Sequence, residues 1–159
     1  MELFKKNWFF FLVIIVAFLL DRVTKIYVID FFLTQKIETH YLTSFINIVL
    51  IWNTGIAFGL LESDSNFYHF LSVLIFCLIA FLLIWLLMSQ SKFEKISISL
   101  IVGGALGNFY DRVIYNAVPD FIDLHYLDFH WFVFNVSDII VTLGIILLIM
   151  KDIVLKKYA

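Results

Sequence analysis

The segments Val118-Pro119-Asp120-Phe121-Ile122-Asp123 and Phe134-Asn135-Val136-Ser137-Asp138 hold the last predicted loop and the head of the last predicted helix. They place Asp120 and Asp138 on either side of a short aromatic segment. The rest of the chain avoids charge. Its 159 residues are 63% hydrophobic and 15% charged, whereas about one quarter of the residues in soluble domains are charged. The sequence therefore predicts an integral membrane protein in which these two carboxylates have a function.

Four apolar runs are long enough to cross a membrane. They cover about residues 7–29, 67–88, 93–114 and 136–155, each near the roughly 20 residues that span about 30 Å of hydrocarbon. We therefore expect an all-α membrane protein with four transmembrane helices, folded as a single integral membrane domain over residues 1–159.

Basic residues predict the orientation of these helices. The arrangement places seven lysines on one side: Lys5, Lys6, Lys92, Lys95, Lys151, Lys156 and Lys157. Because lysine and arginine collect on the cytoplasmic side, both termini are expected to be cytoplasmic. The segments about 30–66 and 115–135 would then face outward.

Both outward segments contain short stretches that favour strands. Residues 44–52 are rich in β-branched and aromatic side chains and are too short to span a membrane. We expect a small β-containing extracytoplasmic segment there, between helices 1 and 2. Residues 126–133 are consistent with a hairpin around Asp128.

Three helices carry an acid at a similar height. At 1.5 Å per residue, Asp21, Asp111 and Asp138 lie roughly 20–24 Å from the lysines at the cytoplasmic ends of their helices. Acids at that depth predict a polar pocket that opens toward the outer face. The alternative is that these acids only mark helix ends and reach to the headgroups with neighbouring basic residues.

Other polar residues are suited to such a pocket. Asn108 and Arg112 are four apart and share a helix face. Asn53 offers both a donor and an acceptor, whereas Gly55 is expected to serve a turn or helix packing. The Gly103-x-x-x-Gly107 spacing favours close helix packing.

Composition and motif spacing also weigh against several functions. A net charge of -2 provides no basic field for nucleic acid. A metallohydrolase could use an acid and histidine set, but no His-x-x-x-His or paired-cysteine spacing occurs; that set is Asp120, Asp123, His125, Asp128, His130 and Asp138. A small transporter or channel could use Asp21, Asp111 and Asp138 as an ion relay, but internal pseudo-symmetry is absent from the sequence.

Five segments together resemble the bacterial lipoprotein signal peptidases, the signal peptidase II family. These are residues 21–25, 53–59, 104–112, 118–123 and 134–138. The resemblance implies an aspartyl endopeptidase of the bacterial plasma (inner) membrane, working near the extracytoplasmic face without metal or cofactor. Its substrates would be diacylglyceryl prolipoproteins, cut before the lipidated cysteine. Its partners would be these substrates and membrane lipid, and we expect a monomer.

The same resemblance assigns candidate roles to residues. Asp120 and Asp138 would be the catalytic pair. The substrate-binding and supporting residues would be Asp21, Lys25, Asn53, Gly55, Asn108, Asp111, Arg112 and Asn135. Arg22 departs from the family pattern, where glutamine is expected.

The predicted chemistry also follows from the residue types alone. Two neighbouring carboxylates can share one proton, so one group activates water while the other protonates the carbonyl oxygen and the leaving amine. Asp138, in the first turn of a helix, is expected to be the ionised partner. Asp120, beside apolar Phe121 and Ile122, is expected to carry the proton. Asp123 is expected to have a structural role.

Overall fold

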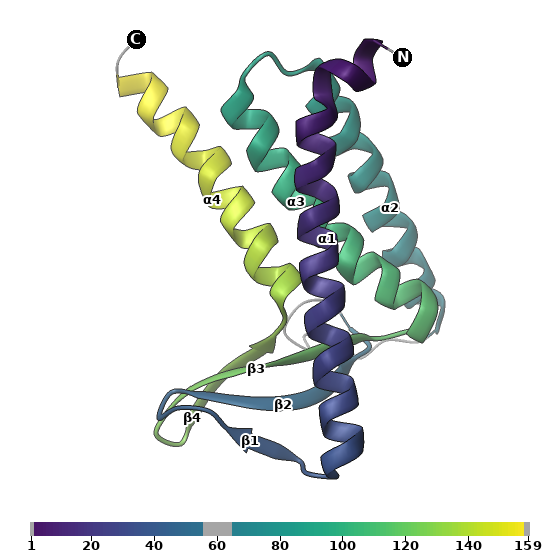
Figure 1. Ribbon diagram of the computed structural model, residues 1–159, viewed down its shortest axis with the longest axis vertical. Coiled ribbons are helices and arrows are strands. Elements are labelled where there is room, and N and C mark those ends of the chain that lie inside the picture. Colours follow the sequence, from purple (N-terminus) through teal and green to yellow (C-terminus); the bar gives the residue numbers. More distant parts are fainter. Residues whose placement is uncertain (1, 56–64, 158–159) are drawn as a thin grey trace.

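The computed structural model describes residues 2–55 and 65–157. Within these residues the chain forms helices and strands in the order α1 (Glu2–Gln35), β1 (Thr39–Tyr41), β2 (Ile46–Asn53), α2 (Ser65–Met88), α3 (Lys92–Tyr115), β3 (Val118–Tyr126), β4 (Phe129–Phe134) and α4 (Val136–Lys157). Figure 1 shows the helices side by side, with the strands gathered at one end. α1 begins and α4 ends at the opposite end from the strands.

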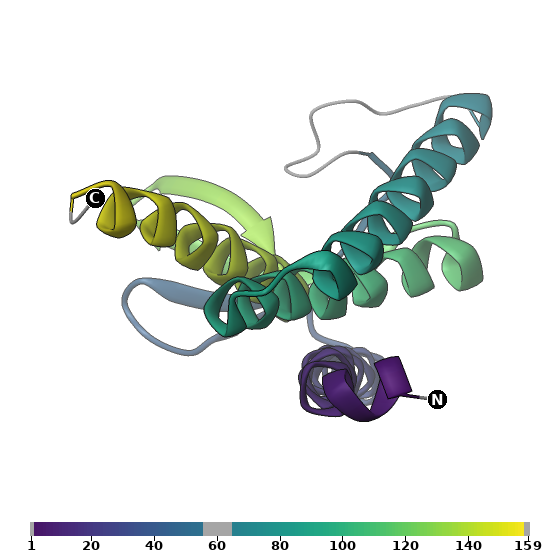
Figure 2. The same cartoon turned by 90° about the horizontal axis from the view of Figure 1, so that it is seen from above.

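Helix α3 occupies the centre of the bundle and packs against α1, α2 and α4. The view along the bundle shows α1, α2 and α4 spread around it (Figure 2). Its ends are well defined: Ser91 caps the N-terminus by accepting from the backbone N–H of Glu94, and Asn116 ends the helix in the left-handed region. α1, at 34 residues, extends beyond the predicted 7–29 at both ends.

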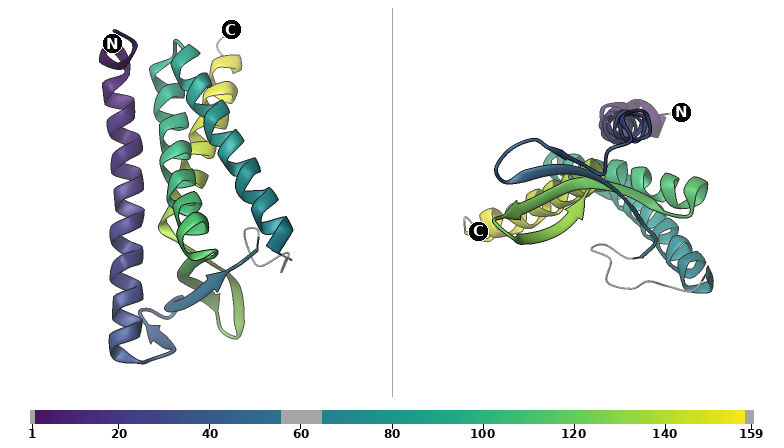
Figure 3. Two further views of the ribbon diagram at one scale, coloured as in Figure 1. Left: turned by 90° about the vertical axis from the view of Figure 1, so that its right-hand side faces the viewer. Right: turned by 90° about the horizontal axis from the view of Figure 1, so that it is seen from below.

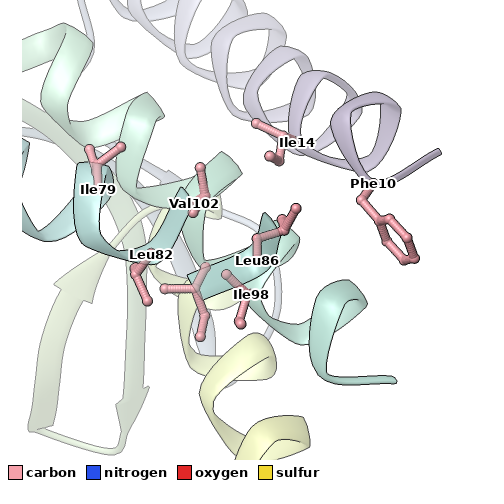
Figure 4. Close-up of a cluster of buried hydrophobic side chains, with 8 residues drawn as sticks. Phe10, Ile14, Ile79, Leu82, Leu86, Ile98 and Val102 are labelled. Carbon is pink, nitrogen blue, oxygen red and sulfur yellow. The ribbon is translucent and has the colours of Figure 1, made fainter. Parts of the chain in front are cut away.

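The helices share an apolar core near the end opposite the sheet. Figure 4 shows Phe10 and Ile14 of α1 with side chains from α2 and α3; those labelled on α2 and α3 are Ile79, Leu82, Leu86, Ile98 and Val102. Leu86, Ile98 and Val102 are fully buried. Many other apolar side chains of the same helices are exposed on the outside of the bundle, which is consistent with the predicted membrane location.

The two segments predicted to face outward join in one antiparallel sheet, with strand order β1-β2-β3-β4. β2 pairs with β3 so that Ile51 lies opposite Asp120 and Asn53 opposite Val118. The hairpin predicted around Asp128 is confirmed as β3 and β4. The predicted fold class, all-α with β structure only between helices 1 and 2, is wrong in that the segment between α3 and α4 also contributes strands to the sheet. Residues 118–126 form a strand because one edge of β3 pairs with the distant β2 and the other edge pairs with β4, the next strand along the chain (Figure 3).

One helix among the described residues has both the length and the apolar composition of a membrane span, His69–Met88 in α2. The other helices carry more polar and charged side chains within their length. Several of these side chains point into the bundle and are buried, among them Asn7, Asp21, Lys25 and Asp111.

Glycines of α3 let its neighbours approach closely, as the Gly103-x-x-x-Gly107 spacing predicted. A Cβ at Gly103 would lie 2.8 Å from the carbonyl oxygen of Ile14 on α1. A Cβ at Gly104 would lie 2.7 Å from the carbonyl oxygen of Ser137 on α4. These contacts are with backbone atoms, which cannot rotate away. The glycines therefore set the distance of α3 from both helices.

Replacing Gly104 with valine should push α4 away from α3 and lower the midpoint of thermal unfolding in detergent. The expected loss is about 1–3 kcal/mol in the free energy of unfolding, the usual cost of overpacking. Leu106→Val is the matched control, because it introduces the same β-branched side chain on the same helix without adding volume. Equal midpoints for the two variants would contradict the close contact between α3 and α4.

Candidate active site

Asp120 and Asp138 come together where β3 and α4 meet. Asp120 lies on β3, with 4% of its surface exposed, and not in a loop as the sequence suggested. Asp138 lies in the first turn of α4 and is half-buried. Asn135, the residue before α4, bridges them: its side-chain amide donates to Asp120 Oδ1 at 2.6 Å, and its backbone N–H donates to Asp138 Oδ2 at 3.1 Å.

Asn135 also caps α4. Its side-chain oxygen accepts from the backbone N–H of Asp138 at 3.1 Å. Together with the return bond from the Asn135 N–H to the Asp138 carboxylate, this is the reciprocal arrangement of a capping box. Asn135 therefore both caps α4 and binds the two carboxylates.

Two further asparagines complete the donors around the carboxylates. Asn53 donates to Asp120 Oδ2 at 2.9 Å, and its own oxygen accepts from the backbone N–H of Gly55. Asn108 donates to Asp138 Oδ1 at 2.8 Å, and its oxygen accepts from Lys25 Nζ at 2.7 Å. In each asparagine a donor bound to the oxygen fixes the direction of the amide. All four carboxylate oxygens therefore face a donor.

Behind Asp138 lies a buried ion cluster of two acids and two cations. Lys25 Nζ lies 3.0 Å from Asp21 Oδ2 and 2.7 Å from Asp111 Oδ2. Arg22 pairs with the same acids, at 2.9 Å to Asp21 and 2.6 Å to Asp111. Asp21 also accepts from the backbone N–H of Ser137 at 3.0 Å, which ties α1 to the head of α4. The side chains of Asp21, Lys25 and Asp111 are fully buried.

The carboxylates open into a cavity of about 270 Å³ between the helices and the sheet. Its polar lining consists of Asn53, Asn108, Arg112, Asp120, Asn135 and Asp138. Its apolar lining consists of Leu71, Ile75, Leu78, Ala105, Val118 and Val141. Leu71, Ile75 and Leu78 follow one another at helical spacing, so α2 presents an apolar wall to the acids.

Burial raises the pKa of Asp120 from its ordinary value of 3.8 to about 6, and the nearby charge of Asp138 adds to the rise. The amides of Asn53 and Asn135 favour the charged carboxylate and limit this effect. Asp120 is therefore suited to hold a proton near neutral pH more readily than an exposed aspartate.

The raised pKa predicts that Asp120 lowers stability at neutral pH. Because the folded state favours protonation of Asp120, the protonated carboxyl group stabilises the fold fully below pH 3.8. This stabilisation is lost as the pH rises through about 6. As the pH rises from roughly 4 to 7.5, the free energy of unfolding of Asp120→Asn should increase by up to about 3 kcal/mol relative to that of the parent protein. Thermal unfolding of both proteins across this range measures the gain. A difference that stays constant with pH would contradict the prediction.

A sequence model described as Signal peptidase (SPase) II matches residues 13–154. The chain belongs to the signal peptidase II family. Membership makes it a protease, and its relatives and structural neighbours place it among membrane enzymes.

Individual members of the family match nearly the whole chain. The lipoprotein signal peptidase of Pelagibacter ubique is 46% identical over 149 residues, which cover 92% of this chain and 89% of the relative. That of Francisella tularensis subsp. novicida is 37% identical over 161 residues and 99% of both chains. A bacterial membrane enzyme solved by the in meso method at 2.3 Å resolution matches with a TM-score of 0.74 and 28% identity, covering 94% of this chain and 89% of the other.

The structure brings the predicted site residues together in two layers. Asn53, Asn108, Arg112, Asp120, Asn135 and Asp138 line the cavity. Asp21, Lys25 and Asp111 lie behind them in the ion cluster. Gly55 joins the first group through its backbone, since its carbonyl accepts from Arg112 at 3.5 Å. Of the predicted segment 53–59, residues 56–59 lie outside the described part of the chain.

The predicted height of the helical acids is consistent with these contacts, because Asp21 binds the residue next to Asp138. The alternative that the acids reach to the headgroups is wrong for Asp21 and Asp111, whose side chains are fully buried. Sequence reasoning missed the part played by Arg22, which pairs with both acids. The four-residue spacing from Asp21 to Lys25 could have indicated that this pair shares a cluster. Arg22 is the direct neighbour of Asp21, and residues one apart on a helix do not usually face each other, so no local pattern indicated its part.

Asp123 lies on the same strand as Asp120 but contacts a different set of residues. It accepts from Asn47 at 3.2 Å and lies 2.9 Å from Nδ1 of His130. His130 stacks in turn on His125. Within residues 2–55 and 65–157, no three acid, histidine or cysteine side chains gather as metal ligands, so the set considered for a metallohydrolase does not assemble there.

Proposed function

We propose that this chain is an intramembrane aspartyl endopeptidase that removes signal peptides from diacylglyceryl prolipoproteins, cleaving before the lipidated cysteine. The observation that carries the proposal is the pair of carboxylates, Asp120 and Asp138, joined by Asn135 and open to a cavity with an apolar wall. The names of the lipoprotein signal peptidases that match the chain support the substrate class.

The proposed reaction uses one water molecule and one shared proton. Asp138, ionised, takes a proton from water as the oxygen attacks the scissile carbonyl carbon. Asp120, protonated, donates to the carbonyl oxygen. The tetrahedral intermediate then collapses as the leaving amine takes a proton from the pair and a hydroxyl group of the intermediate returns one to it, so the pair again holds one proton. The raised pKa of Asp120, about 6, supports this division of roles. The amides of Asn53, Asn108 and Asn135 hold the carboxylates in place before substrate arrives.

The fold suits a substrate that is itself a membrane segment. In our proposal all four helices cross the bilayer, both termini are cytoplasmic and the sheet lies on the extracytoplasmic side. The apolar wall of Leu71, Ile75 and Leu78 would contact the apolar part of the signal peptide. The scissile bond would then lie beside Asp120 while the acyl chains remain in lipid. We propose that the chain does this as a monomer in the plasma membrane.

The test is cleavage by the purified full-length protein in liposomes, followed by mass spectrometry of the products. A diacylglyceryl prolipoprotein should be cut at the bond before the modified cysteine, with a chelator present or absent. The same precursor without the diacylglyceryl group is the matched control and should remain intact. Cleavage that stops with chelator and returns with zinc would point to a metallohydrolase. Ion flux through the liposomes without cleavage would point to a channel or transporter.

A further inference from the structure

We propose that Lys25 is a positioning residue for Asp138 and acts through the side-chain amide of Asn108. This inference rests on the proposed role of Asp138 in peptide hydrolysis. It assigns to a buried lysine on α1 a part in preparing an acid on α4, with a residue of α3 between them.

The contacts of Lys25 use all of its hydrogen-bond donors. Its ammonium group has three N–H donors, and three oxygens lie within hydrogen-bond distance: Asp21 Oδ2 at 3.0 Å, Asp111 Oδ2 at 2.7 Å and Asn108 Oδ1 at 2.7 Å. The side chain is fully buried, so water does not compete for these donors. An ammonium group cannot accept a hydrogen bond, and the amide oxygen of Asn108 must therefore face it.

This contact decides what Asn108 presents to Asp138. With its oxygen on Lys25, the amide must point its NH2 group toward Asp138 Oδ1, where the distance is 2.8 Å. A flipped amide would place oxygen against oxygen at Asp138 and NH2 against the ammonium of Lys25. The amides of Asn53 and Asn135 are held instead by backbone N–H groups, of Gly55 and Asp138. Among these three asparagines, Asn108 alone depends on a side-chain cation for its direction.

The consequence for Asp138 is that Oδ1 must act as an acceptor. The backbone N–H of Asn135 imposes the same condition on Oδ2. A carboxylate held by two such donors is favoured over the protonated acid, which is what the proposed base requires. Lys25 thus supports the ionised state of Asp138 without touching it.

Other charged groups face the same region and must be kept constant in a test. Asp120 of β3 shares Asn135 with Asp138, and Arg112 of α3 lines the same cavity. Asp21 and Arg22 of α1 and Asp111 of α3 form the rest of the ion cluster. The described side chains that α2 contributes to the cavity are apolar.

Arg22 provides a matched control, because it shares both acids with Lys25. No contact of Arg22 with Asn108 is among those the described residues show. Removing either cation together with the charge of Asp111 leaves one acid and one cation in the cluster. The pair Lys25→Met/Asp111→Asn breaks the contact with Asn108. The pair Arg22→Gln/Asp111→Asn preserves it.

The experiment is the pH–rate profile of the full-length enzyme in liposomes, with kcat and KM measured for both pairs. Lys25→Met/Asp111→Asn should lower kcat roughly tenfold with little change in KM. Its acidic limb should move upward by about half a pH unit or more, because the ionised pair has lost a charge-oriented donor. Arg22→Gln/Asp111→Asn should keep the acidic limb of the parent enzyme. Asn108→Ala, which removes the amide and leaves both acids and both cations of the cluster in place, should move the limb in the same direction as the lysine pair.

Two results would overturn the proposal. One is an acidic limb that moves equally in both double variants, which would indicate a general charge effect. The other is an acidic limb that does not move in Asn108→Ala, which would show that the amide does not affect the ionisation of Asp138. This second result can be interpreted even if the lysine variant does not fold. Both apply to an enzyme that cleaves its substrate, so they differ from a failure of the proposed function, in which the parent protein itself would not cleave.

Discussion

Asp120→Asn and Asp138→Asn should each reduce the rate of prolipoprotein cleavage by roughly 10³-fold or more, since each removes one half of the general acid–base pair. Neither change alters the size of the side chain. The amide at position 120 can still accept from one of Asn53 and Asn135, so the sheet and the head of α4 are expected to fold normally. The loss should therefore appear in kcat, with the protein still inserted in the membrane.

The matched control for both variants is Asp123→Asn. Asp123 is on the same strand as Asp120 and is buried to the same extent, with 4% of its surface exposed. Its contacts are with Asn47 and His130 and not with the candidate site. We expect this variant to keep most of the activity. Near-normal cleavage by Asp120→Asn or Asp138→Asn would end the proposal that the two acids form the catalytic pair.

The helices could be predicted because their signal is local. Runs of apolar residues near 20 in length indicated all four helices to within a few residues, apart from the two ends of α1. The sheet depends on pairing between distant segments, such as Ile51 with Asp120, and a single sequence contains little information about that register. The register is what places Asp120 in a strand and beside Asn53, in place of the loop that was predicted.

The sequence indicated which residues belong to the site better than it indicated which of them contact one another. Helical rise and the family resemblance both indicated Asp21, Asp111 and Asp138, because depth along a helix follows from counting residues. Which cation pairs with which acid depends on how the helices are rotated against one another. The contact between Lys25 and Asn108 joins residues 83 positions apart, and no local pattern encodes it. The difference between Asp120 and Asp123 likewise follows from which face of β3 each occupies.

Asp21→Ala should destabilise the protein by about 3–5 kcal/mol, the usual cost of removing one partner from a buried ion pair. Asp21 accepts from Arg22, Lys25 and the backbone N–H of Ser137, and its side chain is fully buried. Without it, two cations share Asp111 alone, and the Ser137 N–H loses its acceptor. Thermal unfolding in detergent measures the effect, which should be accompanied by loss of cleavage because Ser137 adjoins Asp138.

Two further variants separate this charge effect from a general weakening of α1. Asp30→Ala removes an exposed acid from the same helix and should leave the unfolding midpoint nearly unchanged. Asp21→Asn/Arg22→Gln leaves one acid and one cation in the cluster, and the new amide oxygen can accept from Ser137. This pair should recover much of the stability that Asp21→Ala loses. If Asp21→Ala were as stable as Asp30→Ala, the buried cluster could not be what holds α1 against the head of α4. The route from Lys25 to Asp138 would then lose its structural basis as well.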